Sequence, residues 1–283
     1  MKTVHAVVVS LLLLLGSPVA WAAKDLSVTV MSYNIRCGSC EATSDVNHWS
    51  KRKFLVEKVI RAAQADVVGL QEAELFQVKD LVALLKDFDW VGVGREDGRE
   101  QGEMNAVLVR KKRFSIAAQQ TLWLSPTPDK VSRGWDAALN RTVAVLTLES
   151  KTSGVRWMFL NTHFDHEGQV ARTESAKQIA ALAQPLLGKM PVVVVGDLNG
   201  TARFDGYTTL TAPLRDAARV SATPATGGDI TFNGFGKDLQ PGNTIDYVLV
   251  SPGIKVQSHR VITDRYQGLY PSDHFPIATR LSF

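Results

Sequence analysis

The segment Val192-Val193-Val194-Val195-Gly196-Asp197-Leu198-Asn199 joins four consecutive valines to a carboxylate and an amide. A strand with no polar face must be covered on both sides, as strands are in layered α/β proteins. The polar side chains follow at the point where the strand ends. In layered α/β folds, strand ends at one edge of the sheets are where binding and catalytic sites assemble.

Three other apolar segments end in the same way. Their polar endings are Asn34, the pair Gln71-Glu72, and Asn161 with His163. Each buried strand is followed directly by an amide, a carboxylate or an imidazole side chain. We therefore expect these side chains to contribute to one site.

Short apolar segments alternate along the chain with segments whose apolar residues recur at helical spacing, which predicts one domain of mixed β-sheets covered by helices. The expected strands are Leu26–Asn34, Val67–Gln71, Trp90–Gly94, Asn105–Arg110, Arg141–Glu149, Val155–Asn161, Val192–Val195, Thr244–Val250, Val256–Ile262 and Ile277–Leu281. The expected helices are Lys51–Gln64, Phe76–Asp87 and Glu167–Leu187, the last of which meets Pro185 near its end.

The composition is that of an ordinary globular protein. The chain has 283 residues, of which 45% are hydrophobic and 21% are charged. A formal charge of +4 is too small for a strongly basic nucleic-acid coat protein. The two cysteines exclude a disulfide-dense scaffold and a zinc site built from four thiolates.

Residues 1–22 have the pattern of a signal peptide, which leaves residues 23–283 as the functional domain. Lys2 supplies the positive charge, Ala6–Leu15 supplies the apolar run, and Ala20-Trp21-Ala22 supplies the small residues of a cleavage site. The alternative is a retained N-terminal anchor, but the apolar run is too short to span a bilayer alone. We expect export to the periplasm or the medium, with no transmembrane anchor after processing. No obligatory protein partner is evident.

Cys37 and Cys40 form the sequence Cys-Gly-Ser-Cys. In an exported protein this pair could close a small disulfide loop. A redox-active pair would begin a helix after a strand, whereas the polar stretch Glu41–Asn47 follows here. A structural or idle pair is favoured, and its oxidation state stays open.

Two polar clusters lie in the C-terminal third. Asp246 interrupts the apolar strand Thr244–Val250, and a buried, unpaired carboxylate is costly. His274 in Ser272-Asp273-His274-Phe275-Pro276 is a natural partner, because an Asp–His pair raises the pKa of the imidazole.

Asn34, Glu72 and Asp273 offer only hard oxygen ligands, which suit Mg2+ or Mn2+ better than Zn2+. An oxygen-bound divalent cation beside carboxylates and a charged imidazole fits chemistry at phosphoryl oxygens. The sequence has no Gly-x-Ser-x-Gly elbow, no Walker loop and no His-Glu-x-x-His motif. These absences argue against a serine hydrolase, NTP-driven transfer and a zinc protease.

The motifs together resemble those of the endonuclease/exonuclease/phosphatase superfamily, which includes DNase I, AP endonucleases, bacterial sphingomyelinases, inositol polyphosphate 5-phosphatases and deadenylases. The matching motifs, in order, are Ser32–Arg36, Gln71-Glu72, Asn161–His163, Gly196–Asn199, Ile245–Val248 and Ser272–Pro276. This resemblance covers essentially the whole expected domain. It implies a four-layered α/β sandwich of two packed mixed β-sheets flanked by helices.

The resemblance also implies roles for individual residues. Glu72 would be the principal Mg2+ or Mn2+ ligand, assisted by Asn34 and Asp273. Asp197 would orient or deprotonate the attacking water, with Asn199 holding the water or the phosphate. His274, oriented by Asp246, and His163, supported by Glu103, would bind the phosphate from two sides.

A narrower likeness to a bacterial branch with mostly unassigned substrates rests on Trp123–Pro126, Gly134–Arg141 and Thr162–His166. That branch has proline where Asn140 stands, so the loop shape stays open. Arg141 could clamp phosphate bidentately. His166 and Asp165 either face the substrate or hold a loop.

Five remaining aromatic or imidazole residues carry less weight. For the loop aromatics Trp135, Phe232 and Phe235, packing is favoured over contact with a base or a lipid. His48 and His259 lie in no motif and are expected to be structural.

The leading hypothesis is a metal-dependent phosphoesterase that hydrolyses a phosphodiester or phosphomonoester by direct water attack. Its phosphate-ester substrate could be a nucleic acid, a phospholipid head group, or a sugar or inositol phosphate. The rival class is a non-catalytic binding module on the same fold. Such a module would be expected to lack a catalytic group, yet Asn34, Glu72, Asp197, Asp246 and His274 are all present.

Overall fold

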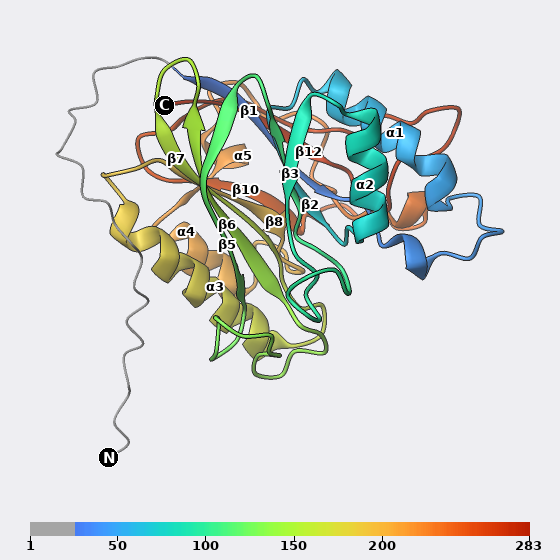
Figure 1. The fold of residues 1–283 in the computed structure, drawn as a ribbon, viewed down its shortest axis with the longest axis horizontal. Helices are drawn as coiled ribbons and strands as arrows, with labels where there is room; N and C mark the ends of the chain where they lie inside the picture. Colours follow the sequence, from blue (N-terminus) through green and yellow to red (C-terminus); the bar gives the residue numbers. More distant parts are fainter. Residues whose placement is uncertain (1–25) are drawn as a thin grey trace.

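A computed structural model describes residues 26–283 of the chain. Two β-sheets of six strands pack face to face, and helices cover their outer faces (Figure 1). The predicted four-layered sandwich is therefore confirmed. The expected signal peptide at residues 1–22 lies outside the described residues. Within residues 26–283, no helix is long and apolar enough to cross a membrane.

The first sheet has the strand order β11-β12-β1-β2-β4-β3. Its strands are β1 (Ser27–Asn34), β2 (Val67–Gln71), β3 (Phe88–Val91), β4 (Val107–Arg110), β11 (Lys255–Val261) and β12 (Ile277–Ser282). β1 and β2 are parallel and are joined through α1 (Trp49–Ala62), whereas the other neighbours are antiparallel. α2 (Leu75–Leu84) joins α1 on the outer face of this sheet (Figure 1).

The second sheet has the order β5-β6-β7-β8-β10-β9. Its strands are β5 (Phe114–Trp123), β6 (Thr142–Ser150), β7 (Arg156–His163), β8 (Val192–Asp197), β9 (Arg215–Asp216) and β10 (Asp246–Val250). β7 and β8 form its parallel pair and are joined through α3 (Gln169–Ala183). The remaining short elements are α4 (Asp205–Thr211), α5 (Ala217–Val220) and the 3-10 turns Gly38–Cys40, Gln184–Leu186 and Gly234–Gly236.

The valine run in β8 faces two different cores, as its lack of a polar face predicts. Val193 and Val195 lie in the core between the sheets, whereas Val192 and Val194 pack with the residues under α3. A third apolar cluster fills the space between the first sheet and the helices α1 and α2. Since side chains alternate along a strand, each buried strand contributes side chains to the core on either side of its sheet.

The same alternation places polar groups at one end of the layer between the sheets. Asp197 follows Val193 and Val195 on the inner face of β8, and Asp246 stands opposite it on β10. His163 is in register with Asp197 from the other side, on β7. The inner layer is thus apolar along most of its length and polar where these strands meet.

Most predicted strands and helices differ by a few residues at their ends, and the short elements β9, α4 and α5 were not predicted. Three further differences are larger or more informative. The expected strand Trp90–Gly94 lies instead at Phe88–Val91. The long helix covers only Gln169–Ala183, because Pro185 forces a 3-10 turn after it. The strand Phe114–Trp123 was not among the expected strands, because half of its residues are exposed and it shows no apolar alternation.

Asn161 joins the two sheets just beneath the polar end. Its side-chain oxygen accepts a hydrogen bond from Gln71 on β2 at 2.6 Å, and its amide nitrogen donates to the backbone oxygens of Leu70 and Ala106. Residue 69 must be glycine, because a Cβ there would lie 2.6 Å from the Asn161 side-chain oxygen. This contact sets how closely the sheets approach near the site.

We predict that Asn161→Ala lowers the free energy of unfolding by about 2–4 kcal/mol, because it leaves buried backbone and amide groups without partners. Urea denaturation measures the change. The control is Gln120→Ala on the exposed part of β5, for which a change within about 0.5 kcal/mol is expected. Equal stability of the two variants would contradict the bridging role.

Candidate active site

Asn34 connects two carboxylates that come from different sheets. Its side-chain amide donates one hydrogen bond to Glu72 Oε1 at 2.9 Å and another to Asp197 Oδ2 at 3.1 Å. Asn34 ends β1, Glu72 follows β2, and Asp197 ends β8. Asn34 and Asp197 are almost fully buried, so the amide holds both carboxylates in a fixed relation.

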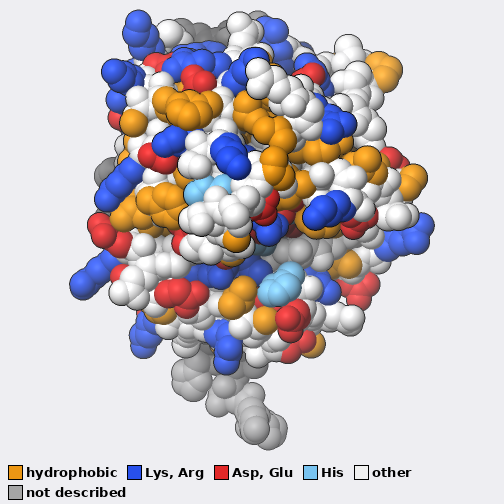
Figure 2. Space-filling model, turned by 90° about the vertical axis from the view of Figure 1, so that its right-hand side faces the viewer, with side chains coloured by type: hydrophobic (Ala, Val, Ile, Leu, Met, Phe, Trp, Pro, Cys, Tyr) orange, Lys and Arg blue, Asp and Glu red, His pale blue; other side chains and the backbone are white. Residues whose placement is uncertain are grey.

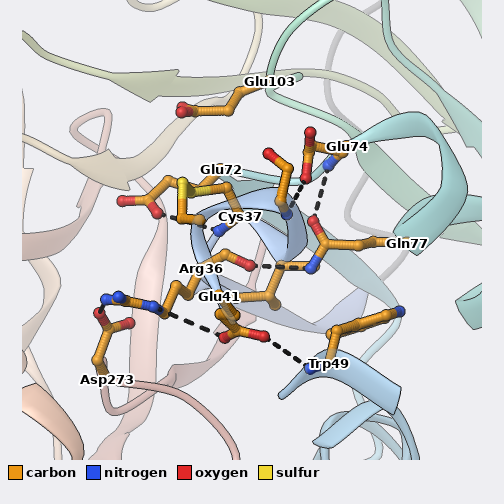
Figure 3. The surroundings of a disulfide bond; sticks show 12 residues. Arg36, Cys37, Glu41, Trp49, Glu72, Glu74, Gln77, Glu103 and Asp273 are labelled. Atoms are coloured by element: carbon orange, nitrogen blue, oxygen red, sulfur yellow. Dashed lines mark hydrogen bonds and ion pairs between the residues drawn. A yellow bond between two sulfur atoms is a disulfide. The ribbon is translucent and has the colours of Figure 1, made fainter. Parts of the chain in front are cut away.

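Glu72 and Asp273 are held by the turn that follows Asn34. The backbone N–H of Cys37 donates to Glu72 Oε2 at 3.2 Å, and Arg36 binds Asp273 Oδ2 at 2.6 Å. Figure 3 shows the two carboxylates and the Arg36 guanidinium on the same side of this turn. Ser272, next to Asp273 in the chain, donates to the Asn34 backbone oxygen at 2.8 Å and so fixes this segment against the end of β1.

The Glu72 carboxylate fits a divalent cation, and Asn34 and Asp273 offer further oxygens, one on each of which accepts a hydrogen bond from Arg36. Each Glu72 oxygen accepts one hydrogen bond within the described residues, and a carboxylate oxygen can accept a second ligand. The donors are hard carboxylate and amide oxygens, which Mg2+ and Mn2+ prefer. The structure thus brings together the residues predicted to bind the metal.

Asp246 and His274 form a buried pair opposite Asp197. His274 Nδ1 lies 2.9 Å from Asp246 Oδ2, and its Nε2 lies 3.8 Å from Asp197 Oδ2. Burial alone would lower the pKa of His274, but the Asp246 carboxylate raises that pKa to about 10. The ring is therefore an imidazolium at neutral pH, with its edge-to-face neighbour Phe232 at 5.1 Å between ring centres.

Ligand atoms of Asp197, Asp246 and His274 lie within 4.8 Å of one another, which is a spacing that could hold a metal ion. A protonated imidazole has no lone pair to offer a metal, and its Nδ1–H is engaged by Asp246. A divalent cation would therefore bind on the Glu72 side of Asn34, and this cluster can hold and move a proton.

Asp197 has the environment of a general base. Burial and the neighbouring Asp246 raise the pKa of Asp197 to about 7, and the Asn199 backbone N–H donates to its Oδ1 at 2.8 Å. A base works best when its pKa lies near the working pH. Asn199 has a φ of +45°, a strained value for a non-glycine residue that local contacts must hold in place.

His163 faces Asp197 from β7 and is held by Arg141. Its Nδ1 lies 3.0 Å from an Arg141 guanidinium nitrogen, and its Nε2 lies 3.0 Å from the Asn199 amide and 3.6 Å from Asp197 Oδ2. A guanidinium can only donate, so Nδ1 carries no proton. Burial and the charge of Arg141 lower the pKa of His163, so the ring is neutral.

Arg141 also contacts the other two residues expected near the phosphate. Its guanidinium lies 3.3 Å from Asp165 Oδ2 and 3.0 Å from His166 Nδ1. Asp165 accepts backbone hydrogen bonds from Ala138, Leu139 and Gly168 and so joins two loops. Burial opposes ionisation of Asp165, but these donors outweigh it and hold its pKa well below the usual range. Asp165 is fully buried, whereas His166 is exposed at the rim.

Glu103 lies in the site but makes a different contact from the expected one. Its carboxylate binds Arg95 at 2.5 Å, and burial raises the pKa of Glu103 to about 7. The ring nitrogen of His163 that Glu103 was expected to support faces Arg141 instead. Glu103 and His163 nevertheless line one narrow cavity, which also includes Glu72, Arg95 and Arg141.

The sequence did not assign roles to two arginines that the structure places in the site. Arg36 stands in the Ser32–Arg36 motif but was given no function, and Arg95 lies in a loop between β3 and β4 with no recognisable pattern. Figure 2 shows Lys, Arg and His side chains around a central hollow on one face, with Asp and Glu side chains beside them. The spacing of Arg95 and Glu103 gives no signal, because their contact depends on the fold of the loop.

The remaining aromatic and histidine residues have the packing roles expected of them, except for Trp135. The ring centre of Phe235 lies 5.5 Å from the guanidinium carbon of Arg36 and 5.5 Å from that of Arg52. His48 accepts the Ser50 N–H as the N-cap of α1, and His259 is hydrogen-bonded to Thr279. Trp135 is 39% exposed and has a φ of +49°.

Comparison with known proteins identifies the family. Residues 31–274 match the model of the Endonuclease/Exonuclease/phosphatase family, so the chain belongs to this family. Its fold is that of phosphoester hydrolases.

Two solved structures from Bacteroides thetaiotaomicron are similar over nearly their whole length. An endonuclease/exonuclease/phosphatase family protein is 33% identical, with a TM-score of 0.86 over 92% of this chain and 99% of that one. A mannosyl-6-phosphatase is 32% identical, with a TM-score of 0.85 over 90% of this chain and 100% of that one. An uncharacterised protein of Acanthamoeba polyphaga mimivirus is 22% identical over 177 residues, which are 60% of this chain and 66% of that protein.

We predict that the His274 ring remains protonated at pH 8 and loses its proton near pH 10, because Asp246 stabilises the charged form. In Asp246→Asn the ring titrates at a lower pH. Imidazole 15N chemical shifts of the metal-free protein measure both transitions. His259 is the internal reference, since burial lowers its pKa to about 4 and keeps it neutral across this range.

The same pair affects stability. A raised pKa in the folded state stabilises the protein fully below pH 6.5, and this contribution disappears as the pH rises toward 10. Asp246→Asn should therefore be less stable than the wild type at pH 6 but should lose less stability between pH 7 and 10. An identical pH dependence of the two proteins would contradict the ion pair.

Proposed function

We propose that the protein is a divalent-metal-dependent hydrolase of phosphate esters that acts by direct attack of water. The observation that carries this proposal is the Asn34 amide between Glu72 and Asp197, which places the cation ligand beside the candidate base. His163 and His274 flank Asp197 at 3.6 and 3.8 Å. The five groups whose loss would favour a binding module are present and gathered in one place.

The phosphate would lie where positive charge and hydrogen-bond donors converge. The His274 imidazolium and Arg141 supply charge, and His163 approaches Asp197 from the strand on the other side. Positive groups placed around the nonbridging oxygens stabilise the charge of the transition state. Asn199 would hold the phosphate or the attacking water, and His166 would contact the substrate at the rim.

Asp197 would take a proton from the attacking water while the oxygen of this water forms a bond to phosphorus. The ester P–O bond then breaks, and the leaving oxygen takes up a proton. Glu72, Asn34 and Asp273 would hold Mg2+ or Mn2+, which supplies Lewis-acid polarisation of the phosphoryl oxygens when bound. No side chain forms a covalent bond with the substrate in this scheme.

A sugar phosphate monoester is the substrate class that we favour over nucleic acid. The mannosyl-6-phosphatase is 32% identical and aligns over its whole length. The formal charge of +4 gives little general attraction to a nucleic-acid backbone.

We also propose that the protein is exported, on the strength of the signal-like pattern in residues 1–22. The Cys37–Cys40 disulfide in the structure supports this proposal, because disulfides persist in oxidising compartments.

We predict that the purified protein releases phosphate from mannose 6-phosphate with Mg2+ or Mn2+ and stops when EDTA is added. Plasmid DNA, sphingomyelin, an inositol phosphate and bis(p-nitrophenyl) phosphate, tested in parallel, are expected to react more slowly. Asp197→Asn should reduce kcat by about 10²–10⁴-fold, since it removes the base.

Asp89→Asn is the matched control, because it makes the same carboxylate-to-amide change at an exposed position on β3. Folded protein that hydrolyses none of these esters would refute the proposed function. Faster cleavage of DNA than of the sugar phosphate would refute only the substrate class.

A further inference from the structure

The turn after β1 is closed by a disulfide beside the metal carboxylate. Cys37 and Cys40 flank the 3-10 turn Gly38–Cys40, with their Cα atoms 5.4 Å apart. The Cys37 side is buried, at 5% exposure, whereas Cys40 is exposed. Figure 3 shows the bridge next to Glu72.

The bridged residue supplies one of the two hydrogen bonds that orient the Glu72 carboxylate within the described residues. The Cys37 N–H donates to Oε2 at 3.2 Å, and the Asn34 amide donates to Oε1 at 2.9 Å. The Asn34 side chain is fixed by the sheets. The position of the Cys37 N–H, in contrast, depends on the conformation of the turn.

The backbone at both ends of this hydrogen bond is strained. Arg36, which precedes the donor, and Glu72, which carries the acceptor, each have a φ of +58°. Non-glycine residues keep such values only where their surroundings hold them. Gln77 and Glu74 at the start of α2 bind the Arg36 backbone oxygen and the Ser39 N–H, and these contacts anchor the turn on its outer side.

A covalent bridge restrains the inner side of the turn, where the donor lies. Gly38 packs so closely against the Phe76 ring that a Cβ there would lie 2.5 Å from it, so the turn has one tightly packed arrangement. The Cys37 N–H and the Arg36 backbone oxygen that Gln77 binds belong to one planar peptide unit, so Gln77 and the bridge together fix the direction of this N–H. Without the bridge, Gln77 alone would restrain it.

We propose that the Cys37–Cys40 disulfide is a positioning element that holds Glu72 in the orientation needed to bind the metal. This inference rests on the proposed function, which makes Glu72 the principal ligand. Groups that orient a metal ligand typically affect metal affinity about 10–100-fold. Reduction of the bond therefore weakens metal binding.

The exposed side of the bridge makes this reduction chemically accessible. A thiolate attacks the Cys40 sulfur, the S–S bond breaks, and the electron pair leaves on the Cys37 sulfur, which takes up a proton. A second thiolate then displaces Cys40 from the mixed disulfide. In total two external thiols are oxidised to a disulfide while Cys37 and Cys40 become two thiols.

The test measures Mn2+ binding without substrate, by electron paramagnetic resonance of the free ion. It compares the oxidised wild type with Cys37→Ser, Cys40→Ser and the double variant. We expect each variant to bind Mn2+ roughly tenfold more weakly. The three losses should be equal, because each variant breaks the same bond. With p-nitrophenyl phosphate, the Mn2+ concentration for half-maximal rate should rise, while the rate at saturating Mn2+ stays close to that of the wild type.

Ser39→Ala is the matched control, since it alters an exposed residue of the same turn and keeps the bridge. Thermal melts fix a temperature at which every protein is folded. If a serine variant does not fold, reduced wild-type protein replaces it. This protein is reduced with dithiothreitol, which is then removed by gel filtration in the absence of oxygen.

An unchanged Mn2+ affinity after loss of the bond would overturn the positioning role. So would a double variant whose loss of Mn2+ affinity equals the sum of the losses in the two single variants. Wild-type protein that neither binds Mn2+ nor hydrolyses any ester would instead refute the proposed function.

Discussion

The Asn34 side chain is the contact on which the site depends. One amide nitrogen carries two hydrogens, and each is donated to a carboxylate from a different sheet. An N–H···O hydrogen bond requires a donor–acceptor distance of about 2.7–3.2 Å and a nearly linear N–H···O angle. The sheets must therefore pack in one register, and the apolar core between them with the Asn161 bridge serves as a spacer that fixes this register.

Burial of several carboxylates at the end of this core creates a demand for positive charge. The pKa of Asp197 is raised, and the charge of Asp246 is balanced by the positive charge of the His274 imidazolium. The Arg36 guanidinium is the cation nearest Asp273. A divalent cation on the Glu72 side would meet the same demand, so the electrostatics that stabilise the fold and those that bind a phosphate ester are one arrangement.

Much of this arrangement could be predicted from the sequence, for a physical reason. Strands buried on both faces cannot contain polar residues at random, so Asp197 and Asp246 at the ends of valine-rich strands are informative. The contacts of Arg95 and Arg141 could not be predicted. Arg141 meets Asp165, whose backbone hydrogen bonds join two loops, and Arg95 meets Glu103 within a third loop. Residue spacing does not encode which side chains such loops bring together. The half-exposed strand Phe114–Trp123 could not be predicted from an apolar pattern, because a strand at the edge of a sheet need not be apolar.

The division between strand ends and loops suggests how one fold serves different substrates. The groups around Asp197 are carried by strands that are locked between two cores. The loop before β6, in contrast, is tied down by Asp136, which accepts the N–H groups of Val170 and Ala171, and by Asp165. This loop brings Asn140 to the rim, where its amide binds Glu96 at 2.7 Å. Because loops tolerate change more readily than packed strands, substitutions there can alter the fit of the alcohol part of an ester while the phosphate chemistry is kept. Asn140 is such a position.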